Sequence, residues 1–158
     1  MTAEAAAVVA AIAREHRRLD ELLGLALAAF SARDAARARE AVSAFDEELR
    51  THTAREENHL YARASGRKLL AGPEEPDGDR LRRELSVEHV QIREVSGMIL
   101  RLLEEKEDPE GARALLPNLL RRWDAHTTRE EAQLAGLVPE ERASALARIF
   151  SVSERDRE

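Results

Sequence analysis

The sequence predicts an all-α protein, an up-down-up-down four-helix bundle with a short additional C-terminal helix. The composition is one reason: of the 158 residues, 43% are hydrophobic, 35% are charged and only 3% are aromatic. Ala, Leu, Arg and Glu are abundant and favour helices, whereas a β-sandwich or barrel needs more aromatic and β-branched residues. Long apolar stripes at helical spacing, separated by helix breakers, are the other reasons. We expect one domain over residues 1–158, with a four-helix core at about 2–137 and the C-terminal helix at about 139–152.

The first half of the chain contains two such stripes. The first predicted helix buries Ile12, His16, Leu19, Leu23, Ala26 and Phe30. A short turn at residues 31–34 follows, with Asp34 as a good N-cap for the second helix. The second stripe consists of Val42, Phe45, Leu49, His52, Glu56 and His59 and fades near Ser65 and Gly66. Residues 71–79, rich in Gly, Pro and acidic side chains, predict a loop between the two halves.

The second half repeats the pattern. A third helix is expected from about Asp79, with the stripe Leu85, His89, Ile92, Ser96, Ile99 and Leu103. Asp108 followed by Pro109 is a good helix start, and the fourth stripe is Leu116, Leu119, Trp123, His126, Glu130, Leu134 and Leu137. Pro117 interrupts this stripe, so the fourth helix is expected either to begin or to kink there. A shorter helix after Pro139 packs Leu146, Ile149 and Phe150, and residues 151–158 are expected to be frayed.

Charge and cysteine content exclude several classes of function. The net charge of −6 argues against electrostatic binding to nucleic acid. Without cysteine there is no disulfide, thiolate zinc site or iron–sulfur cluster, so any metal must be held by imidazole and carboxylate groups. The longest apolar run, residues 22–30, is too short for a bilayer, which needs ~20 residues. The Ala-rich start lacks the basic region of a signal peptide. We therefore expect a cytoplasmic protein, not bound to a membrane, that is a monomer or weak homodimer.

An internal repeat relates the two helix pairs. The segment His52-Thr-Ala-Arg-Glu56-Glu57 recurs 74 residues later as His126-Thr-Thr-Arg-Glu130-Glu131. The dipeptide Glu-His at residues 15–16 recurs at residues 88–89. The agreement of these offsets predicts two similar helix pairs related by a pseudo-two-fold axis.

All five histidines fall on the predicted apolar stripes, and each of the four helices contributes at least one. Buried imidazole and carboxylate groups cost several kcal/mol each unless they are paired or bound. In both His-x-x-x-Glu pairs the two side chains share one helix face. The predicted metal ligands are His16, His52, Glu56, His89, His126 and Glu130. If both glutamates bridge, two metal ions each receive two nitrogens and two oxygens, which suits iron better than manganese or zinc.

The segments that begin at His16, His52, His89 and His126 resemble those of the hemerythrin-like, or HHE cation-binding, family, and the resemblance covers roughly residues 10–150. The resemblance implies a bundle that holds two iron ions in a non-haem, oxo- or hydroxo-bridged centre. It also implies that the four histidines are terminal ligands and that Glu56 and Glu130 bridge. Proteins of this family are associated with oxygen carriage or sensing, iron sensing, and handling of peroxide or nitric oxide.

The chain departs from the oxygen-carrying hemerythrins in two places. Those proteins have a fifth ligand histidine one turn along the third helix, where this chain has Arg93 after His89 and Leu85 before it. Their fourth helix has a His and an Asp five residues apart, whereas His126 and Glu130 are four apart. These differences favour reaction with a small oxidant, such as dioxygen, hydrogen peroxide or nitric oxide, over reversible oxygen storage.

Other residues near the predicted ligands have less defined roles. His59 and Tyr61 are candidates for additional ligands or for groups that support the ligands, although packing is the simpler expectation for both. Trp123 is expected to shield one end of the bundle. Glu57, Glu131, Arg55 and Arg129 are expected either on the solvated face or as partners that orient the ligating carboxylates.

The sequence leaves three functions open. The first is a di-iron protein of oxidative or nitrosative stress, with a catalase-like or peroxidase-like activity that the sequence alone does not establish. The second is an iron- or oxygen-sensing module without turnover. The third is a metal-free structural bundle.

Overall fold

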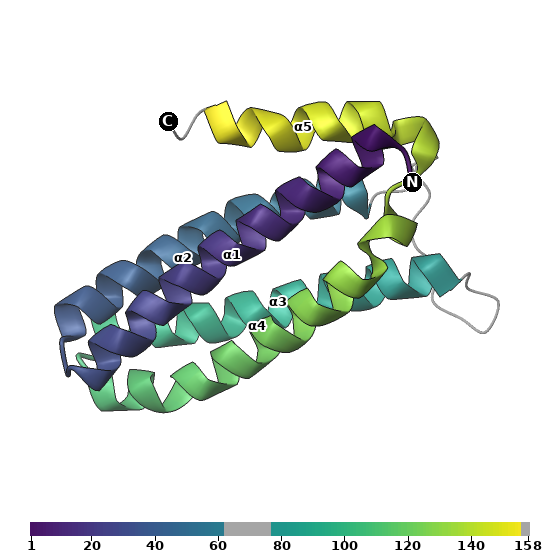
Figure 1. The fold of residues 1–158 in the computed structure, drawn as a ribbon. Helices are drawn as coiled ribbons and strands as arrows, with labels where there is room; N and C mark the ends of the chain where they lie inside the picture. Colours follow the sequence, from purple (N-terminus) through teal and green to yellow (C-terminus); the bar gives the residue numbers. More distant parts are fainter. Residues whose placement is uncertain (62–76, 156–158) are drawn as a thin grey trace.

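The computed structural model describes residues 1–61 and 77–155, which form helices and contain no strand (Figure 1). The four long helices are α1 (Ala3–Ser31), α2 (Ala35–Arg55), α3 (Asp77–Glu104) and α4 (Pro109–Leu137). A π-helical turn, η1 (Glu56–Leu60), extends α2. A 3₁₀ turn, η2 (Glu140–Arg142), leads into the last helix, α5 (Ala143–Arg155). The predicted all-α architecture with a short C-terminal helix is confirmed.

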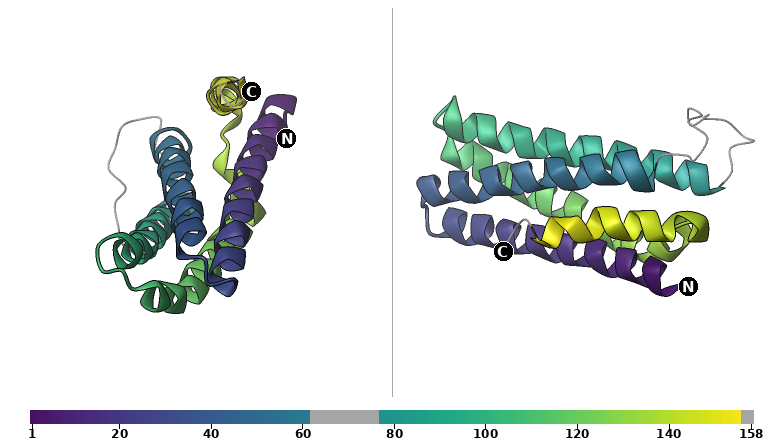
Figure 2. Two further views of the ribbon diagram at one scale, coloured as in Figure 1. Left: turned by 90° about the vertical axis from the view of Figure 1, so that its left-hand side faces the viewer. Right: turned by 90° about the horizontal axis from the view of Figure 1, so that it is seen from above.

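Consecutive long helices run antiparallel and form a bundle (Figure 1). Helix α1 packs against α2 and α4, and α3 packs against the same two helices. Figure 2 shows α5 outside this four-helix arrangement, where it lies along α1. Because Leu146 and Phe150 of α5 are buried, this helix extends the apolar core beyond the bundle. None of the helices in the described part of the chain has the length and apolar character that crossing a membrane requires.

Both predicted N-caps are present. The side chain of Asp34 accepts a hydrogen bond from the backbone N–H of Arg37 at 3.1 Å, and that of Asp108 accepts one from Gly111 at 2.9 Å. Helix α3 begins at Asp77, so residues 77–79 of the expected loop are helical. The rest of that loop and the expected fading point near Ser65 lie outside the described residues.

At the helix ends, one of the two alternatives offered for Pro117 is excluded, and the expectation of a frayed C-terminal segment was wrong for residues 151–155. Helix α4 begins at Pro109, where Asp108 caps it, and passes through Pro117 instead of starting there. Helix α5 continues to Arg155, so residues 151–155 are helical and not frayed. The buried Leu146 and Phe150 anchor this last helix on α1, which supplies the packing that a free C-terminal tail would lack.

Two apolar clusters fill the bundle at different levels. One, with Phe30, Phe45 and Leu119, lies toward the turns that join α1 to α2 and α3 to α4. The other, with Ile12, Leu60, Leu134 and the inner face of α5, lies toward the chain termini. The six predicted metal ligands lie along the helices between these two clusters.

Candidate metal centre

The structure brings together all six side chains that the sequence predicts as metal ligands. None of them is more than 3% exposed. Each long helix contributes, and η1 supplies one carboxylate: the residues are His16 (α1), His52 (α2), Glu56 (η1), His89 (α3), His126 and Glu130 (both α4). This convergence follows from the His-x-x-x-Glu spacing, which places both side chains of each pair on the inward face of a helix.

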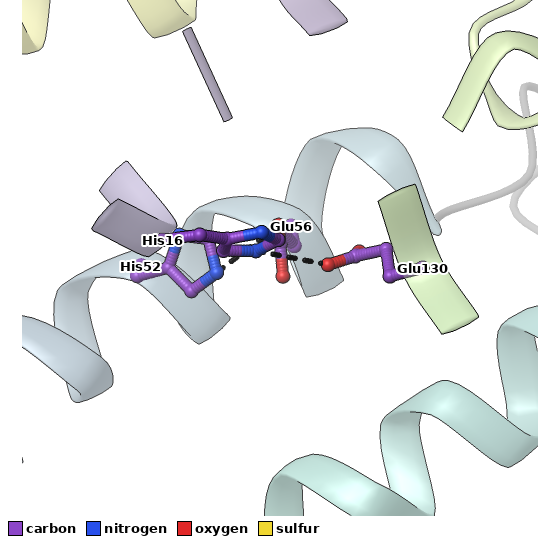
Figure 3. A group of neighbouring side chains, drawn as sticks. All are labelled: His16, His52, Glu56 and Glu130. Carbon is purple, nitrogen blue, oxygen red and sulfur yellow. Dashed lines mark ion pairs between the residues drawn. The ribbon is translucent and has the colours of Figure 1, made fainter. Parts of the chain in front are cut away.

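The six residues form two overlapping groups of potential ligand atoms. His16, His52, Glu56 and Glu130 offer four atoms that all lie within 4.8 Å of one another, and Figure 3 shows these side chains pointing toward a common centre. Glu56, His89 and His126 offer three such atoms. Glu56 belongs to both groups, because Oε1 lies 3.2 Å from His52 Nε2 and Oε2 lies 3.2 Å from His89 Nε2.

A ring of carboxylates surrounds the histidines. Each Nδ1 bonds to a glutamate of a neighbouring helix at 2.7–2.9 Å. The four pairs are His52 with Glu15, His89 with Glu57, His126 with Glu88, and His16 with Glu131. Taken in order, these bonds join α1 to α2, α2 to α3, α3 to α4 and α4 back to α1. They fix the orientation of every imidazole in the cluster.

The ring also determines which nitrogen faces the centre. Because a carboxylate only accepts hydrogen bonds, each Nδ1 carries the proton, and a neutral imidazole then has its lone pair on Nε2. His89 Nε2 and His126 Nε2 lie 3.0 Å apart. Two lone pairs at this distance repel each other unless a cation or a proton lies between them.

Within the described part of the chain, five polar atoms of the six predicted ligands lack a hydrogen-bond partner: Nε2 of His16 and His52, both oxygens of Glu56, and Oε2 of Glu130. Buried polar atoms are rarely left in this state, because the lost hydration is not replaced. Nitrogen and carboxylate oxygen atoms that converge without other partners are what a metal ion requires. The residues present therefore fit a bound metal.

The pKa values show how strongly these groups perturb one another. Burial raises the pKa of Glu56, and the nearby charge of Glu130 raises it further. Burial also favours a higher pKa for Glu130, but the close contact with His16 and the charges of His126 and His16 outweigh it and lower this pKa to about 2. The pKa values of these two neighbouring carboxylates are thus moved in opposite directions, a pattern that is typical of functional sites.

The histidines are similarly divided. Burial lowers the pKa of His52 to about 4, despite the opposing hydrogen bond to Glu15. Burial also lowers the pKa of His16, but its contacts with Glu130 and Glu56 prevail and raise it to about 9. In the absence of metal, a proton held at His16 compensates the carboxylate charge that a cation would otherwise neutralise.

The π-helical turn explains the positions of His59 and Tyr61. The backbone N–H of Tyr61 bonds to the carbonyl of Glu56, five residues back, at 2.8 Å. In an α-helix the residues three and four after Glu56 would face inward, but the wider π turn brings in the residues four and five after it. Leu60 and Tyr61 are consequently buried, whereas His59 is half-buried and lies outside both groups of ligand atoms.

Tyr61 is in direct contact with the cluster. Its hydroxyl donates a hydrogen bond to Oε1 of Glu130, and its ring stacks on His89 with the centroids 5.5 Å apart. Burial and the neighbouring charges of Glu56 and Glu130 raise the pKa of Tyr61, so the hydroxyl keeps its proton. The sequence offered Tyr61 only as one of several alternatives, because α-helical geometry does not place it here.

Trp123 lies within the bundle, next to the cluster, and not over one end as the sequence suggested. Its ring meets those of His16 at 5.5 Å and His126 at 6.0 Å, and on the other side it meets Phe45 at 5.8 Å. The indole Nε1 donates to Asp20 at 2.6 Å. Trp123 therefore separates the polar level from the apolar cluster near the turns.

The outer acidic residues orient the imidazoles and not, as expected, the ligating carboxylates. Glu57 and Glu131 bond to ligand histidines. Glu15 and Glu88 do the same, but the sequence did not predict a role for them. The repeated Glu-His dipeptides at residues 15–16 and 88–89 were the available sequence evidence for them.

The two arginines predicted beside the ligands hold this outer ring. Arg55 bonds to Glu15, and Arg129 bonds to Glu88 at 2.7 Å and also to Glu84. Since each contacts a glutamate that accepts from a ligand histidine, the arginines act one layer further out than the acidic residues.

Comparison with known proteins supports the same interpretation of the cluster. The family model described as the hemerythrin HHE cation-binding domain matches residues 7–138, a span that includes all six predicted ligands. No curated protein and no solved structure gives a significant match.

Proposed function

The chain belongs to the hemerythrin family of HHE cation-binding domains, and on that premise we propose that it binds two non-haem iron ions and reacts there with a small oxidant. The oxidant is dioxygen, hydrogen peroxide or nitric oxide, in a response to oxidative or nitrosative stress. The observation that supports this proposal best is the set of converging, buried nitrogen and oxygen atoms for which the described residues provide no hydrogen-bond partner.

The donor set favours iron. Imidazole and carboxylate ligands without thiolate suit iron, and the overlap of the two groups at Glu56 suits a pair of ions that share a carboxylate. We assign His16, His52, Glu56 and Glu130 to one ion and Glu56, His89 and His126 to the other. A bound iron pair would supply one-electron redox chemistry and coordination positions open to a small ligand.

The surrounding residues prepare the site for that chemistry. The ring of glutamates holds each imidazole in the tautomer that presents Nε2 inward. Trp123 on one side and the apolar cluster with Leu60 and Leu134 on the other exclude water. Tyr61 keeps a proton at its hydroxyl beside Glu130. The assignment of the six ligands to two ions requires no other buried acid or base from the described residues.

The first test is iron content after anaerobic reconstitution. We expect about two irons per chain in the wild type, and a clear loss in His52→Ala and Glu130→Ala, because each removes a donor from the four-atom group. His59→Ala is the matched control, since this half-buried histidine lies outside both groups. A wild-type protein that binds no iron, or a His59→Ala variant that alone loses it, would overturn the assignment.

The second test concerns the reaction. The iron-loaded protein is mixed with oxygen, hydrogen peroxide or nitric oxide while its visible spectrum is followed, and peroxide consumption is measured at steady state. We expect the spectrum to change with at least one oxidant. Sustained peroxide consumption would establish turnover, whereas oxidation of each site only once would favour the sensing alternative. A spectrum unchanged by all three would contradict reaction with an oxidant.

A further inference from the structure

The two halves of the site differ at one place in an otherwise repeated pattern. The four histidines, the two inner glutamates and the ring glutamates recur at offsets of 73 or 74 residues. Tyr61 has no counterpart, because the residue 74 positions later is Ala135. The π turn has no counterpart either, since α4 remains α-helical to Leu137. The repeat is therefore broken where one aromatic hydroxyl enters the cluster.

This hydroxyl acts on a ligand of the opposite half. Tyr61 follows η1, at the end of α2, and its hydroxyl donates a hydrogen bond across the bundle to Glu130 of α4. Its position is held from two directions: its backbone N–H bonds to Glu56, and Arg142 donates a hydrogen bond to the carbonyl of His59 at 2.9 Å. The hydroxyl is thus a fixed donor and not a rotating surface group.

The bond leaves the two oxygens of Glu130 with different partners. Oε1 accepts from Tyr61, whereas Oε2 lies 3.1 Å from His16 Nε2 and 3.6 Å from His126 Nε2. No hydroxyl among the described residues donates to Glu56, and its two oxygens face one histidine of each group. The symmetric arrangement with two equivalent bridging glutamates is consequently not what the side chains form. One group has four potential ligand atoms and the other has three.

We infer that Tyr61 makes the two metal positions unequal and directs the small-molecule ligand to the His89 and His126 position. The inference rests on the proposed metal site. By occupying Oε1, Tyr61 directs Glu130 toward the His16 and His52 position, which has four protein donors. The other position has only three, so it binds its ion more weakly and has more coordination sites for an exogenous ligand. Tyr61 is then a positioning residue, acting through Glu130.

Metal titration of Tyr61→Phe tests this directly, because the substitution removes only the hydroxyl and keeps the buried ring. Anaerobic Fe²⁺ titration by calorimetry should show two unequal binding steps in the wild type. In Tyr61→Phe the released Oε1 can serve the poorer position, so the ratio of the two Kd values should fall about tenfold, the range in which partners of metal ligands act. Azide, used as a small anionic probe of the oxidised protein, should bind to Tyr61→Phe about tenfold more weakly than to the wild type.

Mössbauer spectroscopy of ⁵⁷Fe-loaded protein measures the environment of each iron, which a change in packing alone should not alter. We expect two distinct iron signals of equal area in the wild type, and signals that approach each other in Tyr61→Phe. His59→Ala is the control, because His59 lies in the π turn just before Tyr61 but outside both groups of ligand atoms. This variant should retain the wild-type difference between the two irons.

The possible results distinguish failure of the role inferred for Tyr61 from failure of the proposed iron site. Wild-type protein that binds no iron overturns both. Two equal steps in the wild type, or the same unequal steps in Tyr61→Phe, overturn the inference alone. A strong phenolate-to-iron absorption band in the wild type that is absent from Tyr61→Phe would make Tyr61 a ligand and also overturn it. Thermal unfolding of the metal-free variant verifies that it folds.

Discussion

At the residue scale, the orientation of each ligand histidine depends on a glutamate from the next helix. Glu131 illustrates the arrangement: it follows Glu130 in α4, yet its own bond is to His16 of α1 at 2.7 Å. Its side chain is 45% exposed, so it contributes little to the apolar core. The role of Glu131 can therefore be separated from folding more cleanly than that of the buried ligands.

We expect Glu131→Gln to lower iron affinity about 10- to 100-fold with little change in the stability of the metal-free protein. A neutral amide is a weaker acceptor than a carboxylate and can present its NH₂ group, so it holds the His16 tautomer and ring angle less firmly. Calorimetric titration with Fe²⁺ measures the affinity.

Glu21→Gln is the control for this substitution. Glu21 is 68% exposed in α1 and pairs with Arg18 at 3.6 Å, away from the cluster. Its replacement should leave iron affinity unchanged, as exposed ion pairs contribute little. Equal affinities for Glu131→Gln and the wild type would show that the ring of glutamates does not tune the ligands.

At the element scale, the sequence predicted the helices and their inward faces well, because both depend on local spacing. The stripe positions of α1 and α4 are all buried, including His16, His126 and Glu130. The π turn at Glu56–Leu60 was not predictable in this way. No residue pattern distinguishes it from an α-helical turn, and the tertiary contacts of Tyr61 and Arg142 accompany it. For that reason His59 was placed on the stripe, and contact of Tyr61 with the site was offered only as an alternative to core packing.

The starts of α2 and α4 were predictable from single capping residues, and they permit a quantitative test. Asp108→Ala removes the hydrogen bond to the backbone of Gly111 and should destabilise the protein by about 1 kcal/mol. For a chain of this size, that corresponds to a melting temperature lower by about 2–4 °C. Asp108→Asn should retain nearly all the stability, because Asn caps helices as well as Asp. Similar melting temperatures for the Ala variant and the wild type would contradict the role of this cap.

At the scale of the whole molecule, the bundle has a polar level between two apolar clusters. The six predicted metal ligands, none more than 3% exposed, share that level. Each buried charge costs several kcal/mol unless it is compensated. The four glutamate–histidine bonds compensate part of this cost, but they leave the inward atoms of Glu56 without partners. The metal-free bundle is therefore less stable than its apolar clusters alone would make it.

Metal binding should reverse this destabilisation, because a cation bound only by the folded state shifts the folding equilibrium. At a free Fe²⁺ concentration 1,000 times the Kd, the gain is about 4 kcal/mol, equivalent to about 8–16 °C in melting temperature for a chain of this length. Removal of the metal with a chelator should abolish the gain. In Glu130→Ala the metal-free protein should be less stable than the wild type, because the Tyr61 hydroxyl and His16 lose their buried partner. Its gain from iron should also be much smaller. Differential scanning calorimetry of both proteins, with and without iron, measures the four values, and an iron-dependent gain of the same size in both would place the stabilising metal outside this cluster.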